Sequence, residues 1–207
     1  MEDNIAKEPV ASYSSKHYTY ADYLNFGYDE AVEIIKGKLF KMSPAPSSMH
    51  QIISRNISGL LYNELKGQKC QFFSAPFDVI LPVTGKDFQS SDRVVQPDVC
   101  VICDPDKIKK RGCFGAPDWI VEILSPHTAK KDLQDKFALY EESGVNEYWI
   151  IEPKNHTVEV FVLRDNKYAR INTYVEDDII SCHTLEGKTI DLKEVFEGYQ
   201  LNRYVID

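Results

Sequence analysis

The chain has 207 residues, of which 43% are hydrophobic, and its formal net charge is −8 at pH 7. This length and apolar content suffice for one substantial core. The sequence contains no run of about 18 or more apolar residues, the length that a membrane-spanning helix needs. The acidic balance counts against a general binder of nucleic acid, because polyanions are usually met by a surplus of Lys and Arg. A local basic rim remains compatible with it, at residues 107–111 and 130–131.

No linker divides the sequence, so we expect a flexible N-terminal segment over residues 1–18 and a single domain over residues 19–207. The N-terminus lacks a basic region followed by an apolar segment, which indicates a protein that is not exported. The five cysteines are odd in number and irregularly spaced, a pattern typical of free thiols in a reducing compartment. We therefore expect a cytoplasmic protein.

The first half of the domain begins with a short predicted helix that Thr19 caps. Two apolar-rich runs within residues 31–43 flank Gly37, and they predict a β-hairpin. Apolar residues then recur at helical spacing through residues 48–65, and Gly67 ends this pattern. Strands are predicted next, over residues 69–75, 77–83, 96–103 and 118–124.

A second helix is predicted over residues 128–143, with Leu133, Phe137 and Tyr140 as its apolar stripe and Gly144 as its end. The remaining strand patterns cover residues 147–152, 157–163, 167–175 and 188–192, and a short helix follows over residues 192–198. This order predicts an α/β fold of the α+β kind, with a central mixed β-sheet flanked by helices.

Two acids stand in predicted strands, where a free carboxylate gains nothing from its surroundings. Glu122 lies inside the apolar run of residues 118–124, and Asp98 follows Pro97 at the start of another strand. Burying an isolated carboxylate is costly unless it is protonated, paired or bound to a metal. If the two strands are neighbours, both acids can share a Mg²⁺ or Mn²⁺ ion, since these ions prefer oxygen ligands. Alternatively, Glu122 meets an Arg or Lys in a buried pair and Asp98 caps a strand or turn.

One stripe of the second predicted helix carries Asp132, Lys136 and Tyr140, which are spaced by four residues. Lys136 is expected to reach the carboxylates of the sheet from this stripe. We expect Lys130 and Lys131 to point elsewhere around the helix. The alternative for Lys136 is an exposed pair with Asp132, worth only about 0.2–0.5 kcal/mol.

A strand with Pro-Asp, a strand with Glu and a nearby lysine resemble the PD-(D/E)XK nuclease superfamily. The order of motifs is similar to that of one bacterial branch, the Uma-two family of restriction-endonuclease-like proteins. The segments that carry the resemblance are QPDVCVI, GAPDWIVEILSPHT, KDLQDKFALY and SGVNEYWIIEP, together with the upstream hairpin and first helix, which hold Glu33 and His50. The resemblance covers residues 19–163.

The resemblance implies a restriction-endonuclease-like core and a Mg²⁺- or Mn²⁺-dependent endonuclease, a hydrolase that cuts phosphodiester bonds of nucleic acid, with DNA preferred over RNA. It assigns Asp98, Glu122 and the main-chain carbonyl of Ile123 to the metal, and all three of Asp98, Glu122 and Lys136 to catalysis. The lysine of the superfamily ordinarily lies two residues after the acid, where this chain has Leu124, so the role passes to Lys136. A homodimer is a further expectation, because such nucleases often cut two strands with paired subunits.

Four further residues are candidates for the same site. Glu33 is either an acid that reaches the metal through water or an outward strand residue, and His50 either contacts the phosphate or the metal shell or is a satisfied, partly buried histidine. Asp132 and Tyr140 join them as neighbours of Lys136 on its stripe. Two other functions stay open: a catalytically inactive nuclease-fold protein that acts as a binding or assembly module, and a glycosidase that uses the same two carboxylates.

Overall fold

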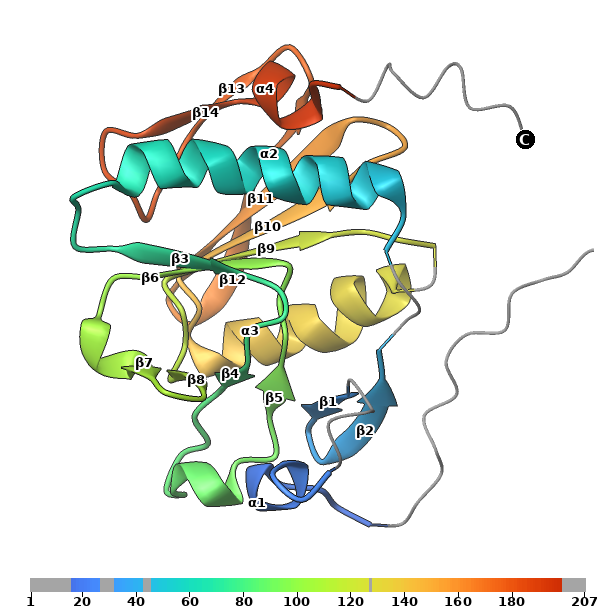
Figure 1. Cartoon of the computed structure of the whole chain (residues 1–207), viewed down its shortest axis with the longest axis vertical. Helices are drawn as coiled ribbons and strands as arrows, with labels where there is room; N and C mark the ends of the chain where they lie inside the picture. The colour runs from blue at the N-terminus through green and yellow to red at the C-terminus, as the bar shows by residue number, and fades with distance from the viewer. Residues whose placement is uncertain (1–15, 27–31, 43–45, 127, 199–207) are drawn as a thin grey trace, which may run out of the picture.

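The computed structural model describes residues 16–26, 32–42, 46–126 and 128–198, and Figure 1 shows the arrangement of their elements. Most of the predicted flexible segment, residues 1–15, lies outside this part of the chain. Within the described residues, no helix is both long enough and apolar enough to cross a membrane.

The central sheet has six strands in the order β12-β11-β10-β9-β6-β3. Its strands are β3 (Gln71–Ser74), β6 (Val99–Ile102), β9 (Trp119–Ile123), β10 (Glu147–Glu152), β11 (Thr157–Arg164) and β12 (Lys167–Val175). Strands β9 and β10 are parallel, and the other neighbours are antiparallel. A parallel pair needs a long crossover, which the second predicted helix supplies. The predicted mixed sheet with flanking helices is confirmed (Figure 1).

Helix α2 (Ser48–Leu65) covers one face of this sheet (Figure 1). Its buried side chains include Ile53, Ile57 and Leu61, which recur every fourth residue and pack on the odd-numbered side chains of β9. The C-terminal elements contribute to the same core; they are β13 (Ile179–Ser181), β14 (Thr189–Asp191) and α4 (Leu192–Phe196). Because helices cover both faces, all five residues of β9 are buried, and Glu122 is among them.

Replacing Leu61 by alanine is expected to lower the free energy of unfolding by about 2–5 kcal/mol, because a cavity would open between α2 and the sheet. Leu61 is fully buried, whereas its neighbour Tyr62 is 58% exposed. Urea unfolding measures the loss, and Tyr62→Ala is the matched control, with an expected change within about 0.5 kcal/mol. An equal loss in both variants would contradict this placement of α2.

The other face of the sheet is covered by α3 (Phe137–Ser143), which continues from a π-helical turn (Lys131–Lys136). The prediction of a regular α-helix is wrong at this turn, and Leu133, predicted in the apolar stripe, is 44% exposed. A π turn closes its hydrogen bonds over five residues instead of four, so it changes which side chains face the sheet. Gly144 ends the helix in the left-handed conformation, as predicted, with φ of 83°.

A second six-stranded sheet has the order β2-β1-β5-β4-β8-β7. Its strands are β1 (Val32–Ile35), β2 (Lys38–Lys41), β4 (Val79–Ile80), β5 (Val94–Val95), β7 (Ile108–Lys109) and β8 (Gly112–Phe114), and helix α1 (Tyr20–Tyr23) lies beside it. The predicted hairpin is confirmed as β1 and β2. The pair of strands β7 and β8 was not predicted, because strands of two or three residues are too short to show an alternating pattern.

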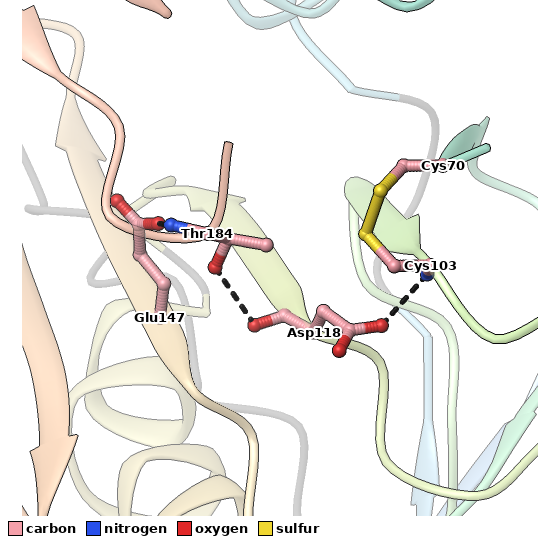
Figure 2. Close-up of a disulfide and its surroundings, with 5 residues drawn as sticks. All are labelled: Cys70, Cys103, Asp118, Glu147 and Thr184. Atoms are coloured by element: carbon pink, nitrogen blue, oxygen red, sulfur yellow. Dashed lines mark hydrogen bonds between the residues drawn. A yellow bond between two sulfur atoms is a disulfide. The ribbon is translucent and has the colours of Figure 1, made fainter. Parts of the chain in front are cut away.

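A disulfide joins Cys70 and Cys103 at the edge of the central sheet (Figure 2). The two cysteines flank the paired ends of β3 and β6, where Gln71 lies opposite Ile102. The expectation of free thiols is therefore wrong for this pair, because strand pairing brings together cysteines that are 33 residues apart in sequence. The other three cysteines are free and buried, as expected of unpaired thiols.

Glu147 is a second buried acid in an apolar strand, and it went unnoticed in the sequence. Its carboxylate accepts hydrogen bonds from Trp149 Nε1 at 2.7 Å and from the Thr184 N–H at 2.6 Å. The Thr184 hydroxyl in turn donates to the carbonyl of Asp118 (Figure 2). Neutral donors therefore satisfy Glu147 and fix the loop after β13 to the sheet, which is what a purely structural buried acid requires.

Candidate functional site

The pairing of β6 with β9 brings the two predicted acids together. Val99 lies opposite Val121 in this antiparallel pair, so Asp98, the residue just before β6, lies at the end of the pair where Glu122 stands. The charge of Asp98 acts on Glu122, which agrees with this placement. Asp98 Oδ2 also accepts a hydrogen bond from the Ile123 N–H at 2.7 Å. The expectation that the two strands are neighbours is confirmed.

Glu122 faces the α3 side of the sheet and is 2% exposed. Its Oε1 atom accepts hydrogen bonds from Lys136 Nζ at 2.8 Å and from the Tyr140 hydroxyl at 2.7 Å. Both donors lie on the predicted stripe of the second helix, so the expected reach of Lys136 to the sheet is confirmed. Since both bonds go to Oε1, neither of them occupies Oε2.

Glu33, from strand β1, is fully buried beside the same lysine, so the alternative of an outward strand residue is wrong. Its Oε1 lies 2.9 Å from Lys136 Nζ and accepts a hydrogen bond from the Gln96 N–H at 3.0 Å. Its Oε2 lies 2.5 Å from Lys131 Nζ. The second sheet thus contributes an acid that bridges two amines.

Lys131 therefore faces the site, and the expectation that it points elsewhere is wrong. In a regular helix, Lys131 would lie about 100° from Asp132 around the axis. The π turn spans residues 131–136 and brings Lys131 to Glu33, while Asp132 stays buried 3.6 Å from Lys136 Nζ. No signal in the sequence marks this π turn, so Lys131 could not have been found from spacing.

His50 lies in the first turn of α2, with Ser47 as the helix cap, whose side chain accepts the His50 N–H. Its Nε2 is 3.2 Å from Asp98 Oδ1, so it joins the site through Asp98. Burial opposes the charged imidazole, but the bond to Asp98 and the nearby negative charge outweigh it and raise the pKa of His50.

The buried acids fall into two electrostatic classes. Burial disfavours the charged form of Glu33, but Lys136 and Lys131 outweigh it and lower its pKa to about 2. For Glu122, burial together with the charges of Asp132, Asp98 and Glu33 outweighs Lys136 and raises its pKa to about 8. Lys136 is opposed by burial too, yet the three surrounding carboxylates raise its pKa well above the usual value.

Carboxylates outnumber amines at this site. The acids are Glu33, Asp98, Glu122 and Asp132, and the cations close to them are Lys131, Lys136 and the titratable His50. Burial also raises the pKa of Asp132, despite the opposing charge of Lys136. Repulsion among buried carboxylates is relieved either by a proton, as the raised pKa values of Glu122 and Asp132 indicate, or by an additional cation.

The fit to a divalent cation differs among these acids. Among the described residues, no three His, Cys, Asp or Glu side chains surround a common point, so a third donor must come from the main chain or water. Asp98 contacts the Ile123 N–H, and Glu122 precedes Ile123 in the chain, so oxygen ligands of the kind that a hard cation prefers come from neighbouring positions. Glu33 does not fit, because amines contact both of its oxygens.

Three comparisons place this chain among known proteins. The family model Uma2, described as "Putative restriction endonuclease", matches residues 18–200. An uncharacterized protein of Synechocystis sp. (strain ATCC 27184 / PCC 6803 / Kazusa) is 27% identical over 170 residues, which cover 82% of this chain and 85% of that protein. A crystal structure from Anabaena variabilis ATCC 29413, described as "a putative nuclease belonging to DUF820", is similar with a TM-score of 0.68. The two sequences are 21% identical, and the matched region covers 86% of this chain and 97% of the Anabaena chain. The two proteins therefore share the fold.

Proposed function

Since this chain belongs to the Uma2 family of restriction-endonuclease-like proteins, we propose that it is a metal-dependent endonuclease that hydrolyses phosphodiester bonds of DNA. The observation that carries the proposal is that Asp98 binds the Ile123 N–H beside the buried Glu122, at a site where carboxylates outnumber amines. Glu147 provides the contrast, because neutral donors satisfy it and no lysine approaches it in the contacts described above.

Asp98, Glu122 and the carbonyl of Ile123 would hold Mg²⁺ or Mn²⁺. When bound, such an ion supplies activation of water near neutral pH and stabilises negative charge on a phosphate. Glu33, whose pKa is lowered to about 2, stays charged beside Lys136 and helps to keep it protonated, so Lys136 Nζ carries positive charge into the site. Lys136 would then offset charge that develops on the phosphate or orient the attacking water.

The remaining residues of the site act through these groups. Glu33 would position Lys136 and Lys131 instead of binding the ion, since both of its oxygens contact amines. The Tyr140 hydroxyl fixes Glu122 Oε1 at 2.7 Å. His50 would balance the charge of Asp98.

The net charge of −8 favours a second candidate function, a catalytically inactive nuclease-fold protein that serves as a binding or assembly module. Cleavage of DNA distinguishes the two. The endonuclease requires cleavage of supercoiled plasmid in Mg²⁺ or Mn²⁺ that EDTA abolishes, and gel filtration in the same buffers would test the homodimer that paired cuts require.

Asp98→Asn is expected to weaken Mn²⁺ binding at least about tenfold, because a residue outside the ligand set already costs 10- to 100-fold when it is lost. Isothermal titration calorimetry measures this affinity without reference to cleavage. Asp177→Asn is the matched control, since the Asp177 side chain is 83% exposed and pairs with Lys193. Equal Mn²⁺ affinity in the Asp98 and Asp177 variants would contradict the proposed ligand.

A further inference from the structure

A groove of about 800 Å³ opens beside the candidate site, between helix α1, strand β4 and the β7–β8 hairpin. The sequence singled out a basic stretch in this region, and the proposed catalytic groups do not use it. Three exposed cations, Lys109, Lys110 and Arg111, stand at its rim. The chain has a net charge of −8, but this cluster is a local patch of positive charge. Such a patch can attract a polyanion.

The fold holds this basic rim in place. Lys110 and Arg111 form the turn of the β7–β8 hairpin, and Gly112 follows with φ of 132°. A Cβ atom at Gly112 would stand 2.1 Å from the carbonyl oxygen of Asp78, so only glycine permits this close approach. The Cys113 N–H donates to the same carbonyl at 2.8 Å. The three cations therefore stand on a fixed turn at the mouth of the groove.

Aromatic rings line the groove below this rim. Tyr23, Phe26 and Phe77 contribute to its walls, and each is partly exposed. Phe77 stacks on Phe73 with ring centroids 4.1 Å apart and an interplanar angle of 8°, which fixes the ring. Partly exposed, fixed rings beneath a cationic rim are the combination that binds unpaired bases by stacking and their phosphates by charge.

Polar groups connect the groove to the candidate site. Asp78 Oδ1 accepts hydrogen bonds from the Tyr23 hydroxyl at 2.8 Å and from Gln96 Nε2 at 2.7 Å. The main-chain N–H of the same Gln96 donates to Glu33 at 3.0 Å. Gln96 therefore has its side chain in the groove and its backbone at the acidic cluster, two residues before Asp98.

We propose that this groove binds an unpaired segment of the DNA strand adjacent to the scissile bond, so that the preferred substrate carries a single-stranded end or flap. The inference rests on the proposed endonuclease for the position of the cut, but not for the binding itself. Paired bases are closed to stacking on protein rings, so a blunt duplex would reach only the cationic rim.

Fluorescence anisotropy in EDTA tests this binding with three labelled DNA probes of one sequence: a single strand, a duplex with an overhang and a blunt duplex. The parent protein is expected to bind the single strand and the overhang at least about fivefold more tightly than the blunt duplex. Phe77→Leu keeps the apolar contact with Phe73 but removes one of the three rings, and it should reduce this preference.

Charge at the rim is tested with the double variant Lys109→Ala/Lys110→Ala. Loss of two phosphate contacts should reduce the slope of log affinity against log salt by roughly 1.4 for single-stranded DNA. The matched control is Lys66→Ala/Lys69→Ala, which removes the same charge from exposed positions beyond α2 that do not line the groove. The control should keep the slope and the affinity of the parent.

Equal affinity for overhang and blunt probes, or an equal effect of the two double variants, would overturn the inference. EDTA prevents metal-dependent cleavage, so the binding assay does not depend on nuclease activity. A failure of the groove inference can therefore be told apart from a failure of the proposed endonuclease function. Overhang preference in a protein that never cleaves DNA would support the groove and contradict the endonuclease, whereas cleavage without overhang preference would do the reverse.

Discussion

Glu122→Gln is expected to lower the rate of DNA cleavage by about 10²- to 10³-fold, the range found when one group that stabilises developing charge is removed. Glutamine keeps the shape of glutamate and an oxygen that can accept the bonds from Lys136 and Tyr140. It lacks the negative charge that would bind a divalent cation with Asp98. Plasmid cleavage under single-turnover conditions measures the loss.

The same variant should be as stable as the parent, within about 1 kcal/mol, or more stable. Folding raises the pKa of Glu122 to about 8 through burial and neighbouring carboxylates. A carboxyl group whose pKa rises on folding destabilises the folded state at every pH above its unfolded pKa, and glutamine removes that effect. Lys136 would keep Glu33 at 2.9 Å and Asp132 at 3.6 Å.

These two readouts separate function from structure. If Glu122 served only as the partner of Lys136 in a buried ion pair, its loss would cost about 3–5 kcal/mol of stability. Urea unfolding of Glu122→Gln, with the exposed Glu194→Gln of helix α4 as the matched control, measures this cost. A large loss of stability with unchanged cleavage would contradict the catalytic role.

Lys136→Met is expected to have the largest effect on stability, a loss of about 3–5 kcal/mol in the free energy of unfolding. Lys136 contacts the carboxylates of Glu33, Glu122 and Asp132, so methionine would leave these buried acids with one less amine. Cleavage should fall as well, because no other amine contacts Glu122 in the described residues. Thermal and urea unfolding measure the first effect.

A double variant provides the control for this loss. Adding Glu122→Gln to Lys136→Met removes one of the acids left without its amine, so the double variant should be more stable than the sum of the two single changes predicts. Lys131→Met should cost less than Lys136→Met, since Lys131 forms its ion pair within this site with Glu33 and is more exposed than Lys136. Strict additivity of the two changes in the free energy of unfolding would contradict the direct contact between Glu122 and Lys136.

The paired acids could be predicted from the sequence because strand geometry is simple. An acid inside an apolar run must find a partner, and alternation along β9 places Glu122 with Ile120 and Leu124 on one face. Helical spacing of four likewise placed Lys136 and Tyr140 together beneath Glu122. The expected proximity of Glu122 and Lys136 depended on these local periodicities, whereas the metal and catalytic roles of Asp98, Glu122 and Lys136 came from the resemblance to the nuclease superfamily.

Other parts of the site depend on geometry that periodicity does not encode. Lys131 reaches Glu33 through a π turn, and Glu33 comes from a second sheet whose strands β4, β5 and β7 have two residues each. The Cys70–Cys103 disulfide depends on the register of β3 with β6, which the spacing of cysteines does not reveal.

Crystals soaked in Mn²⁺ test the central claim most directly, because Mn²⁺ gives an anomalous signal that no group of the protein can imitate at its wavelength. We expect a peak between the carboxylates of Asp98 and Glu122, within coordination distance of the Ile123 carbonyl. A soak without such a peak, with Glu122 held only by Lys136 and Tyr140 as it is here, would contradict the metal-dependent site and with it the proposed endonuclease.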